Sequence, residues 1–63
     1  MEYRVIISKE HVVDWQSYSM GIVEAIQMAA DMLCDPYYSG CEVMVVERGG
    51  EEPRIVLKEV CCP

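Results

Sequence analysis

Residues 19–34 read SMGIVEAIQMAADMLC, and they decide the fold because no other segment sustains helical periodicity over such a length. At 100° per residue, one narrow apolar arc contains Ile22, Ile26, Ala29 and Leu33. Asp35 and Pro36 end the pattern, since proline cannot continue a helix and disfavours helical geometry in the residue before it. Serines and a glycine near residue 20 each suit an N-cap, so the start is less sharply defined. The sequence predicts a helix over Ser19–Cys34.

Four shorter segments, two on each side of this helix, alternate apolar and polar residues in the manner of β-strands. They are Tyr3–Ser8, Val12–Tyr18, Cys41–Arg48 and Pro53–Val60. Gly49-Gly50-Glu51-Glu52 predicts a hairpin between the last two. The polar residues 8–11 predict another hairpin between the first two, with a single bent strand as the alternative. We expect one α+β domain over residues 1–63, with ββαββ order and the helix on one face of a four-stranded antiparallel sheet.

Alternation along the strands divides their residues between a face covered by the helix and an open face. The predicted covered face contains Tyr3, Val5, Ile7, Val13, Trp15, Val43, Val45, Ile55 and Leu57. The predicted open face contains Arg4, Ile6, Met44, Val46, Arg48, Arg54, Val56 and Lys58. One helix cannot cover both faces, so we expect a contact surface centred on Ile6, Met44, Val46 and Val56, with Arg4, Arg54 and Lys58 around them. On this assignment Val46→Glu disrupts the contact and leaves the fold intact.

The net charge of −6, from 11 acidic and 5 basic residues, disfavours direct nucleic-acid binding, which needs clustered cations. Acidic candidates for partner binding are Glu24, Asp31, Asp35, Glu51 and Glu52, on the helix, its exit and the last hairpin. They keep the protein soluble, or they match a basic site on a partner that normally holds nucleic acid. No apolar run approaches the roughly 20 residues that span a membrane, and the N-terminus lacks the features of a signal peptide. We expect a cytoplasmic protein.

The cysteines and the histidine do not form a recognisable site. Cys34, Cys41, Cys61 and Cys62 lack the spacing of structural zinc sites, so we expect free thiols and no metal or other cofactor. His11, the one histidine, lies beside a predicted turn with no evident partner for base catalysis. We expect no catalytic residues and no enzymatic activity.

Size, acidity and layout resemble those of the small acidic proteins that phages and other mobile elements encode, of which anti-CRISPR inhibitors are the best known. The resemblance rests on the Tyr3–Ile7 strand, the helix carrying Glu24-Ala25-Ile26 and the terminal hairpin. It implies a non-enzymatic inhibitor that binds a host defence complex and blocks its nucleic-acid site or its motion. One alternative is a small structural or regulatory domain that forms homodimers or larger oligomers through the open face. A nucleic-acid-binding role for Arg4, Arg48, Arg54 and Lys58 is a weaker one.

Overall fold

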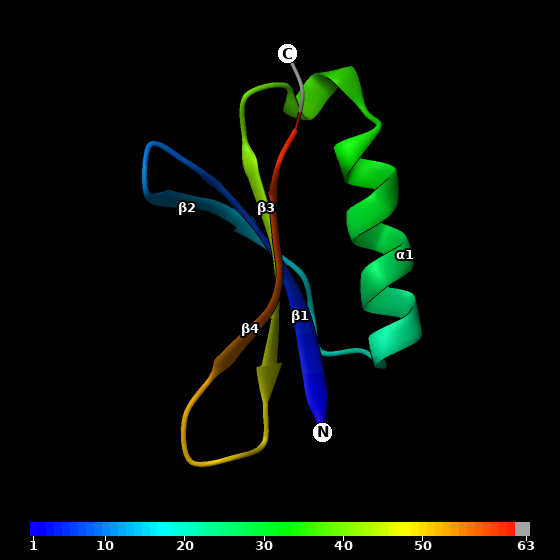
Figure 1. Ribbon diagram of the computed structural model, residues 1–63, viewed down its shortest axis with the longest axis vertical. Coiled ribbons are helices and arrows are strands. Elements are labelled where there is room, and N and C mark those ends of the chain that lie inside the picture. The colour runs from blue at the N-terminus through cyan, green and yellow to red at the C-terminus, as the bar shows by residue number, and fades with distance from the viewer. Residues whose placement is uncertain (62–63) are drawn as a thin grey trace.

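The computed structural model, described here for residues 1–61, has the predicted ββαββ order in one antiparallel sheet with strand order β2-β1-β3-β4 (Figure 1). The strands are β1 (Glu2–Lys9), β2 (Val12–Gln16), β3 (Glu42–Arg48) and β4 (Arg54–Val60). The helix is α1 (Ile22–Leu33), followed by the short 3-10 turn η1 (Pro36–Tyr38). The prediction of an α+β fold with one helix on a four-stranded sheet is therefore confirmed.

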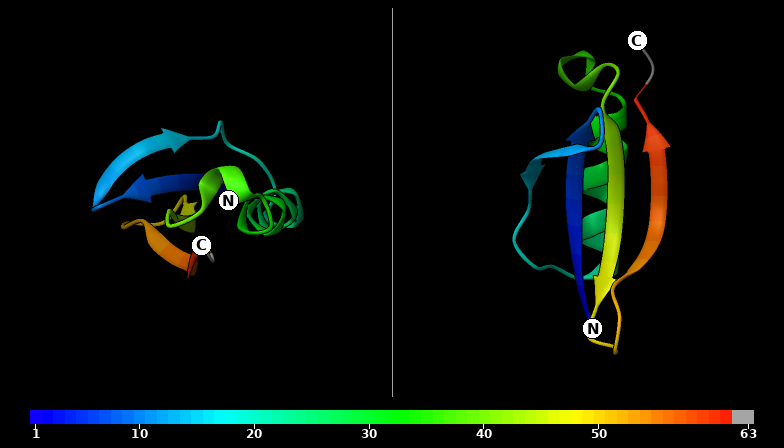
Figure 2. Two further views of the ribbon diagram at one scale, coloured as in Figure 1. Left: turned by 90° about the horizontal axis from the view of Figure 1, so that it is seen from above. Right: turned by 90° about the vertical axis from the view of Figure 1, so that its left-hand side faces the viewer.

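The core lies between α1 and the two central strands. Its buried residues are Val5 and Ile7 from β1, Val43 and Val45 from β3, Cys41, and Ala25 and Ala29 from α1. The strand members follow the period-two alternation that brings every second side chain to one face. Two alanines on the helix let its backbone approach the sheet closely. Figure 2 shows α1 behind β1 and β3, while β2 and β4 form the two edges.

The helix begins later than predicted. Met20 remains extended and pairs with Tyr3: the N–H of Tyr3 donates to the Met20 carbonyl at 3.1 Å, and the N–H of Met20 donates back at 2.9 Å. Gly21 takes the N-cap position, and Cys34 is the C-cap rather than part of the helix. The 12 observed residues span about 18 Å, so the helix is shorter than the adjacent seven-residue strand, at roughly 23 Å.

The helix is also rotated relative to the predicted arc. Ala25 and Ala29 are fully buried, whereas Ile22 is 39% exposed and Ile26 is 41% exposed. The predicted arc is therefore right for Ala29 and wrong for Ile22 and Ile26, since Ala25 is buried where the isoleucines were expected. The alanine pair takes the centre, and the isoleucines lie on the helix flank.

Both predicted hairpins are present, so the alternative of one bent N-terminal strand is wrong. The β1–β2 turn consists of Glu10 (φ 52°) and His11 (φ 66°), the two-residue geometry of a type I′ turn. No residue of β2 is buried. Within residues 1–61, α1 is neither long nor apolar enough to cross a membrane.

Candidate protein interface

The sheet face opposite α1, here called the open face, is built from three rows of residues that pair across the strands. One row is Arg4, Val46 and Ile55. The next is Gln16, Ile6, Met44 and Lys58. The third is Val13, Ser8, Glu42 and Val60, and Glu2 pairs with Arg48 at one end. Ile6, Met44 and Val46 therefore form a continuous apolar centre over the two middle strands, as predicted.

Two β-bulges place several edge residues differently from the prediction. The register of β4 shifts at Val56, so that Ile55 pairs with Val46 on the open face and Arg54 pairs with Glu47 on the helix side. The predicted positions of Ile55 on the covered face and Arg54 on the open face are therefore wrong. Val56 is the additional residue at the bulge, so it does not share a row with the apolar centre.

Asp14 is the corresponding additional residue on β2. It separates Val13, which pairs with Ser8 on the open face, from Trp15, which pairs with Ile7 on the helix side. The prediction that both side chains share the covered face is wrong for Val13. Because an extra residue bends and twists its strand, the two bulges also reshape the edges of the sheet.

The open face is concave along the diagonal between the two hairpin tips. Figure 1 shows the β1–β2 turn and the β3–β4 loop projecting away from α1, on the side of the open face. Val46 is only 7% exposed and Ser8 only 4%, although no helix lies over them. Val46→Glu is therefore a poor probe of the contact, because the side chain is buried; Ile55, which is 53% exposed, is a better one.

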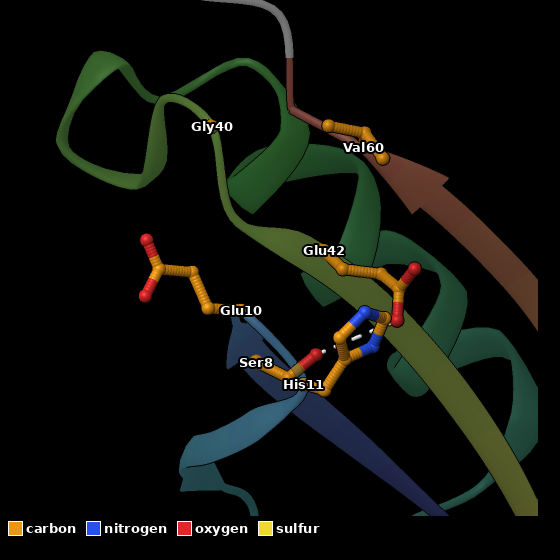
Figure 3. Close-up of a pocket in the computed structure, with 6 residues that line it drawn as sticks. All are labelled: Ser8, Glu10, His11, Gly40, Glu42 and Val60. Atoms are coloured by element: carbon orange, nitrogen blue, oxygen red, sulfur yellow. Dashed lines mark hydrogen bonds between the residues drawn. The ribbon is translucent and has the colours of Figure 1, made fainter.

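A hollow of about 180 Å³ lies at the end of the open face near the β1–β2 turn (Figure 3). Its lining residues are Ser8, Glu10, His11, Gly40, Glu42 and Val60. The left-handed backbone of Glu10 and His11 places both residues of the turn at its rim. His11, the one histidine of the chain, therefore lies beside the polar residues at this end of the open face.

The chemistry of the hollow is that of a polar recess. The Ser8 hydroxyl donates to Glu42 Oε1 at 3.4 Å, a long separation for an O–H···O hydrogen bond. Glu42 also faces Lys58, whose Nζ lies 3.8 Å from Oε2. These contacts link Glu42 to residues on both neighbouring strands. A serine nucleophile is activated by a hydrogen bond to a histidine base, whereas the Ser8 hydroxyl donates to a carboxylate.

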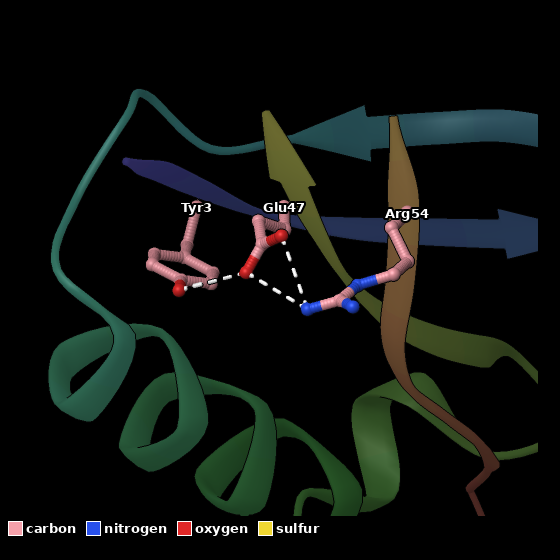
Figure 4. Close-up of polar contacts among 3 residues, drawn as sticks. All are labelled: Tyr3, Glu47 and Arg54. Carbon is pink, nitrogen blue, oxygen red and sulfur yellow. Dashed lines mark hydrogen bonds and ion pairs between the residues drawn. The ribbon is translucent and has the colours of Figure 1, made fainter. Parts of the chain in front are cut away.

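Arg54 belongs to a small polar cluster on the helix side of the sheet (Figure 4). Its guanidinium lies 3.2 Å from Glu47 Oε1, and the Tyr3 hydroxyl donates to Glu47 Oε2 at 2.9 Å. This hydrogen bond to a carboxylate raises the pKa of Tyr3 above its ordinary value. The Arg54 side chain is 73% exposed and that of Glu47 only 14%, so Arg54 supplies the charge that balances a largely shielded carboxylate.

The paired rows of the open face carry less negative charge than the molecule as a whole. The cations of these rows are Arg4, Arg48 and Lys58 and the carboxylates are Glu2 and Glu42, giving 3 − 2 = +1 on a chain of net charge −6. Around the rows, Glu10 at the rim of the hollow and the two glutamates of the β3–β4 loop add negative charge. Arg4 is oriented by its Nε–H, which donates to the Ser19 hydroxyl at 3.3 Å. The open face therefore combines basic and apolar residues as predicted, but it differs from the prediction in two ways. Arg54 lies on the other face, and the carboxylates of Glu2 and Glu42 are present.

The predicted acidic residues do not form one surface. Glu24 and Asp31 are exposed on α1, whereas Glu51 and Glu52 lie in the β3–β4 loop. Asp35 has a local structural role, because its side chain accepts the Tyr37 N–H at 2.9 Å and caps the 3-10 turn. We therefore treat Glu24 and Asp31 as one acidic side and the hairpin pair as another.

Cys34 and Cys41 have free thiols; Cys62 lies outside the described residues. Cys41 and Cys61 are buried, and the Cys61 N–H donates to the Cys41 carbonyl at 2.8 Å beyond the end of the β3–β4 ladder. The Cys61 sulfur also lies 3.4 Å from the Leu33 carbonyl at the end of α1. No group of three or more potential metal ligands among His, Cys, Asp and Glu comes together within residues 1–61.

Comparisons with protein-family models, with curated proteins and with solved structures found no match to this chain.

Proposed function

We propose that this protein is a non-enzymatic binding module that contacts another protein through its open face. The observation that carries the proposal is the apolar centre of Ile6, Met44 and Val46, which no element within residues 1–61 covers. Ile55 and Val13 extend it with side chains that are more than half exposed. An apolar patch rimmed by polar residues is typical of protein-interaction sites.

Strand geometry further supports contact through the face rather than through an edge. Both edge strands contain a bulge, at Asp14 in β2 and at Val56 in β4. Bulges and charged residues on edge strands disfavour the addition of another strand. The open face offers a contact surface that does not depend on the edges.

The polar hollow favours binding over catalysis. Its hydroxyl donates to a carboxylate, and its volume of about 180 Å³ is below the several hundred Å³ typical of small-molecule pockets. We infer that the hollow receives a side chain of the partner at the margin of the contact.

A narrower form of the proposal is inhibition of a host defence complex, as the resemblance to phage-encoded acidic proteins implies. In this form the protein occupies the complex in a fixed ratio and prevents it from binding nucleic acid. Adding the purified protein to a reconstituted CRISPR effector complex tests it directly. We expect loss of nucleic-acid binding at about one protein per complex; retained binding at a large excess of protein contradicts this form alone.

Self-association through the same face is the second candidate. A molecule of net charge −6 repels its copies, and the open face, at +1, is where two copies approach with least repulsion. Size-exclusion chromatography with light scattering separates the candidates. A monomeric mass at micromolar concentration favours a separate partner, and a stable dimer favours self-association.

A matched pair of variants tests the proposed contact. Ile55→Glu places a charge on the open face, and Ile26→Glu places the same charge on the helix flank, at a side chain of similar exposure. Tagged wild-type protein and both variants are used for affinity capture from the native host, followed by quantitative mass spectrometry. We expect the same captured protein with wild type and Ile26→Glu, and its loss with Ile55→Glu. Equal capture by all three folded proteins contradicts contact through the open face.

A further inference from the structure

We propose that the occupant of the open face is an α-helix of the partner protein, with an apolar stripe flanked by acidic side chains. This inference rests on the proposed function and adds the form and charge of the contacting element. It follows from the rows of the sheet, the bulged edges and the distribution of charge.

The dimensions and layering of the sheet favour a helix. The open-face residues of β3 run from Glu42 to Arg48, seven residues that span roughly 23 Å, the length of about 15 helical residues. On its other face, the same twisted sheet already packs α1 along β1 and β3 (Figure 2). Helices on both faces of a sheet are a common layer arrangement, so a partner helix would complete a third layer.

The bulges disfavour the main competing geometry. An extended peptide binds a sheet by adding main-chain hydrogen bonds along a free edge. The register shift at Asp14 interrupts that edge in β2, and the shift at Val56 interrupts it in β4. Asp14 also puts a charge at the centre of the β2 edge, a further obstacle to pairing with another strand.

The position of the cations sets the charge of the helix. Arg4 lies beside Val46 on the β1 side of the apolar centre, and Lys58 lies beside Met44 on the β4 side. Arg48 lies at the end of the centre, next to Val46 in β3. A helix resting on Ile6 and Met44, beside the buried Val46, therefore has a cation on each flank. Acidic residues on both sides of its apolar stripe complement this arrangement.

A second copy of this chain is a less suitable occupant. Its exposed helix surface contains Ile22, Val23 and Ile26 with Glu24 and Asp31, so it is apolar and acidic. However, placing α1 of one molecule on the open face of another leaves the second open face free. Such head-to-tail contacts build filaments rather than a closed pair. Concentration-dependent growth in mass would therefore identify the second copy as the occupant and overturn this proposal.

The test uses two fluorescently labelled 18-residue helical peptides with capped ends. Both have the same leucine and alanine stripe; one has glutamate at every flanking position and the other has lysine. Fluorescence anisotropy at physiological salt measures their binding to the full-length protein. We expect the glutamate peptide to bind at least tenfold more tightly than the lysine peptide. Equal binding, or tighter binding of the lysine peptide, overturns the proposal.

Two double variants locate the binding site. Arg48→Gln/Lys58→Gln removes two cations from the open face, while Lys9→Gln/Arg54→Gln removes the same charge elsewhere. Circular dichroism establishes that both variants are folded. We expect the first to weaken binding of the glutamate peptide by at least fivefold and the second by less than twofold. Equal effects of the two overturn the proposal.

The peptide experiment and the capture experiment can fail independently, so the acidic helix and the contact surface are tested separately. Capture of a protein that is lost with Ile55→Glu, combined with no binding of the glutamate peptide, retains the contact surface and rejects the acidic helix. Capture that is unaffected by Ile55→Glu rejects the contact surface itself.

Discussion

Glu10 and His11 occupy the two central positions of a type I′ turn, where asparagine and glycine are preferred because both backbones have positive φ. Side chains at such positions cost of order 1 kcal/mol each. We therefore expect Glu10→Asn/His11→Gly to raise the free energy of unfolding by about 1–2 kcal/mol, measured by urea denaturation. Glu51→Asn/Glu52→Gly in the other hairpin loop is the control, since those residues lack positive φ. A double variant in the first turn that is no more stable than wild type contradicts the strained geometry.

Tyr3 links one hydrogen bond to the pH dependence of stability. Its hydroxyl donates to Glu47, which raises the Tyr3 pKa in the folded state above the usual value of about 10. The folded protein thus holds this proton more tightly than the unfolded chain. The resulting stabilisation is complete below pH 10 and is lost as pH rises through the folded pKa.

Tyr3→Phe isolates this contribution, because it removes the titrating hydroxyl and keeps the ring. We expect the stability difference between wild type and Tyr3→Phe to shrink as the pH of urea denaturation is raised from 8 to 11. All other titrating groups are present in both proteins, so their contributions to the pH dependence cancel in the stability difference. Glu47→Gln removes the carboxylate and is expected to lower the Tyr3 pKa towards its ordinary value. A stability difference that is constant over this range contradicts the coupling.

Periodicity along the sequence predicted the helix and the four strands, but it did not predict which residues of the edge strands face the helix. Alternation assigns a face correctly only while the register is regular. One extra residue at Val56 reversed the predicted faces of Ile55 and Arg54, and one at Asp14 moved Val13. The sequence contains no glycine at either bulge that would mark it. The central strands have no bulge between them, which is why the faces of Ile6, Met44 and Val46 were predicted correctly.

The packing of α1 yields a prediction with a matched control. Ala29 is fully buried against the sheet, and the next residue, Ala30, is exposed. Leucine at position 29 must push the helix from β1 and β3, so we expect Ala29→Leu to lower the free energy of unfolding by about 1–3 kcal/mol. Ala30→Leu adds the same atoms facing solvent and should change stability by less than about 0.5 kcal/mol. Similar thermal-denaturation midpoints for the two variants would show that the close contact at Ala29 does not limit side-chain size.

Over the molecule, alternation along the strands predicted a basic and apolar sheet face, but not how many carboxylates accompany its cations. The paired rows of the open face carry a charge of +1, on a molecule of net charge −6. Predicting this required knowing that Arg54 turns to the helix side and that Glu2 and Glu42 join the open face. The hollow at Ser8 and His11 likewise depends on residues that meet only when β1, β2 and β3 are assembled.

The charge of the whole molecule and the cations of the open face are expected to affect different rate constants of peptide binding. The acidic body repels an approaching glutamate peptide over distances that salt screens, with a Debye length of about 8 Å at physiological ionic strength. Close contacts with Arg4, Arg48 and Lys58 act once the peptide is seated, and they govern its release. Raising salt from about 20 to 150 mM should therefore increase the association rate constant and also increase the dissociation rate constant. Stopped-flow fluorescence measures both.

Charge reversal on the far side of the molecule separates the two effects. Glu24→Lys/Asp31→Lys changes the net charge by two units per residue, from −6 to −2, while both positions lie on α1, opposite the open face. At low salt we expect faster association of the glutamate peptide, by roughly threefold, with an unchanged dissociation rate constant, because the seated contacts are the same. At 500 mM salt the two proteins should associate equally fast. If the reversal instead leaves the association rate constant at low salt unchanged, the carboxylates of Glu24 and Asp31 do not repel the approaching peptide, and the proposed effect of the acidic body on association is wrong.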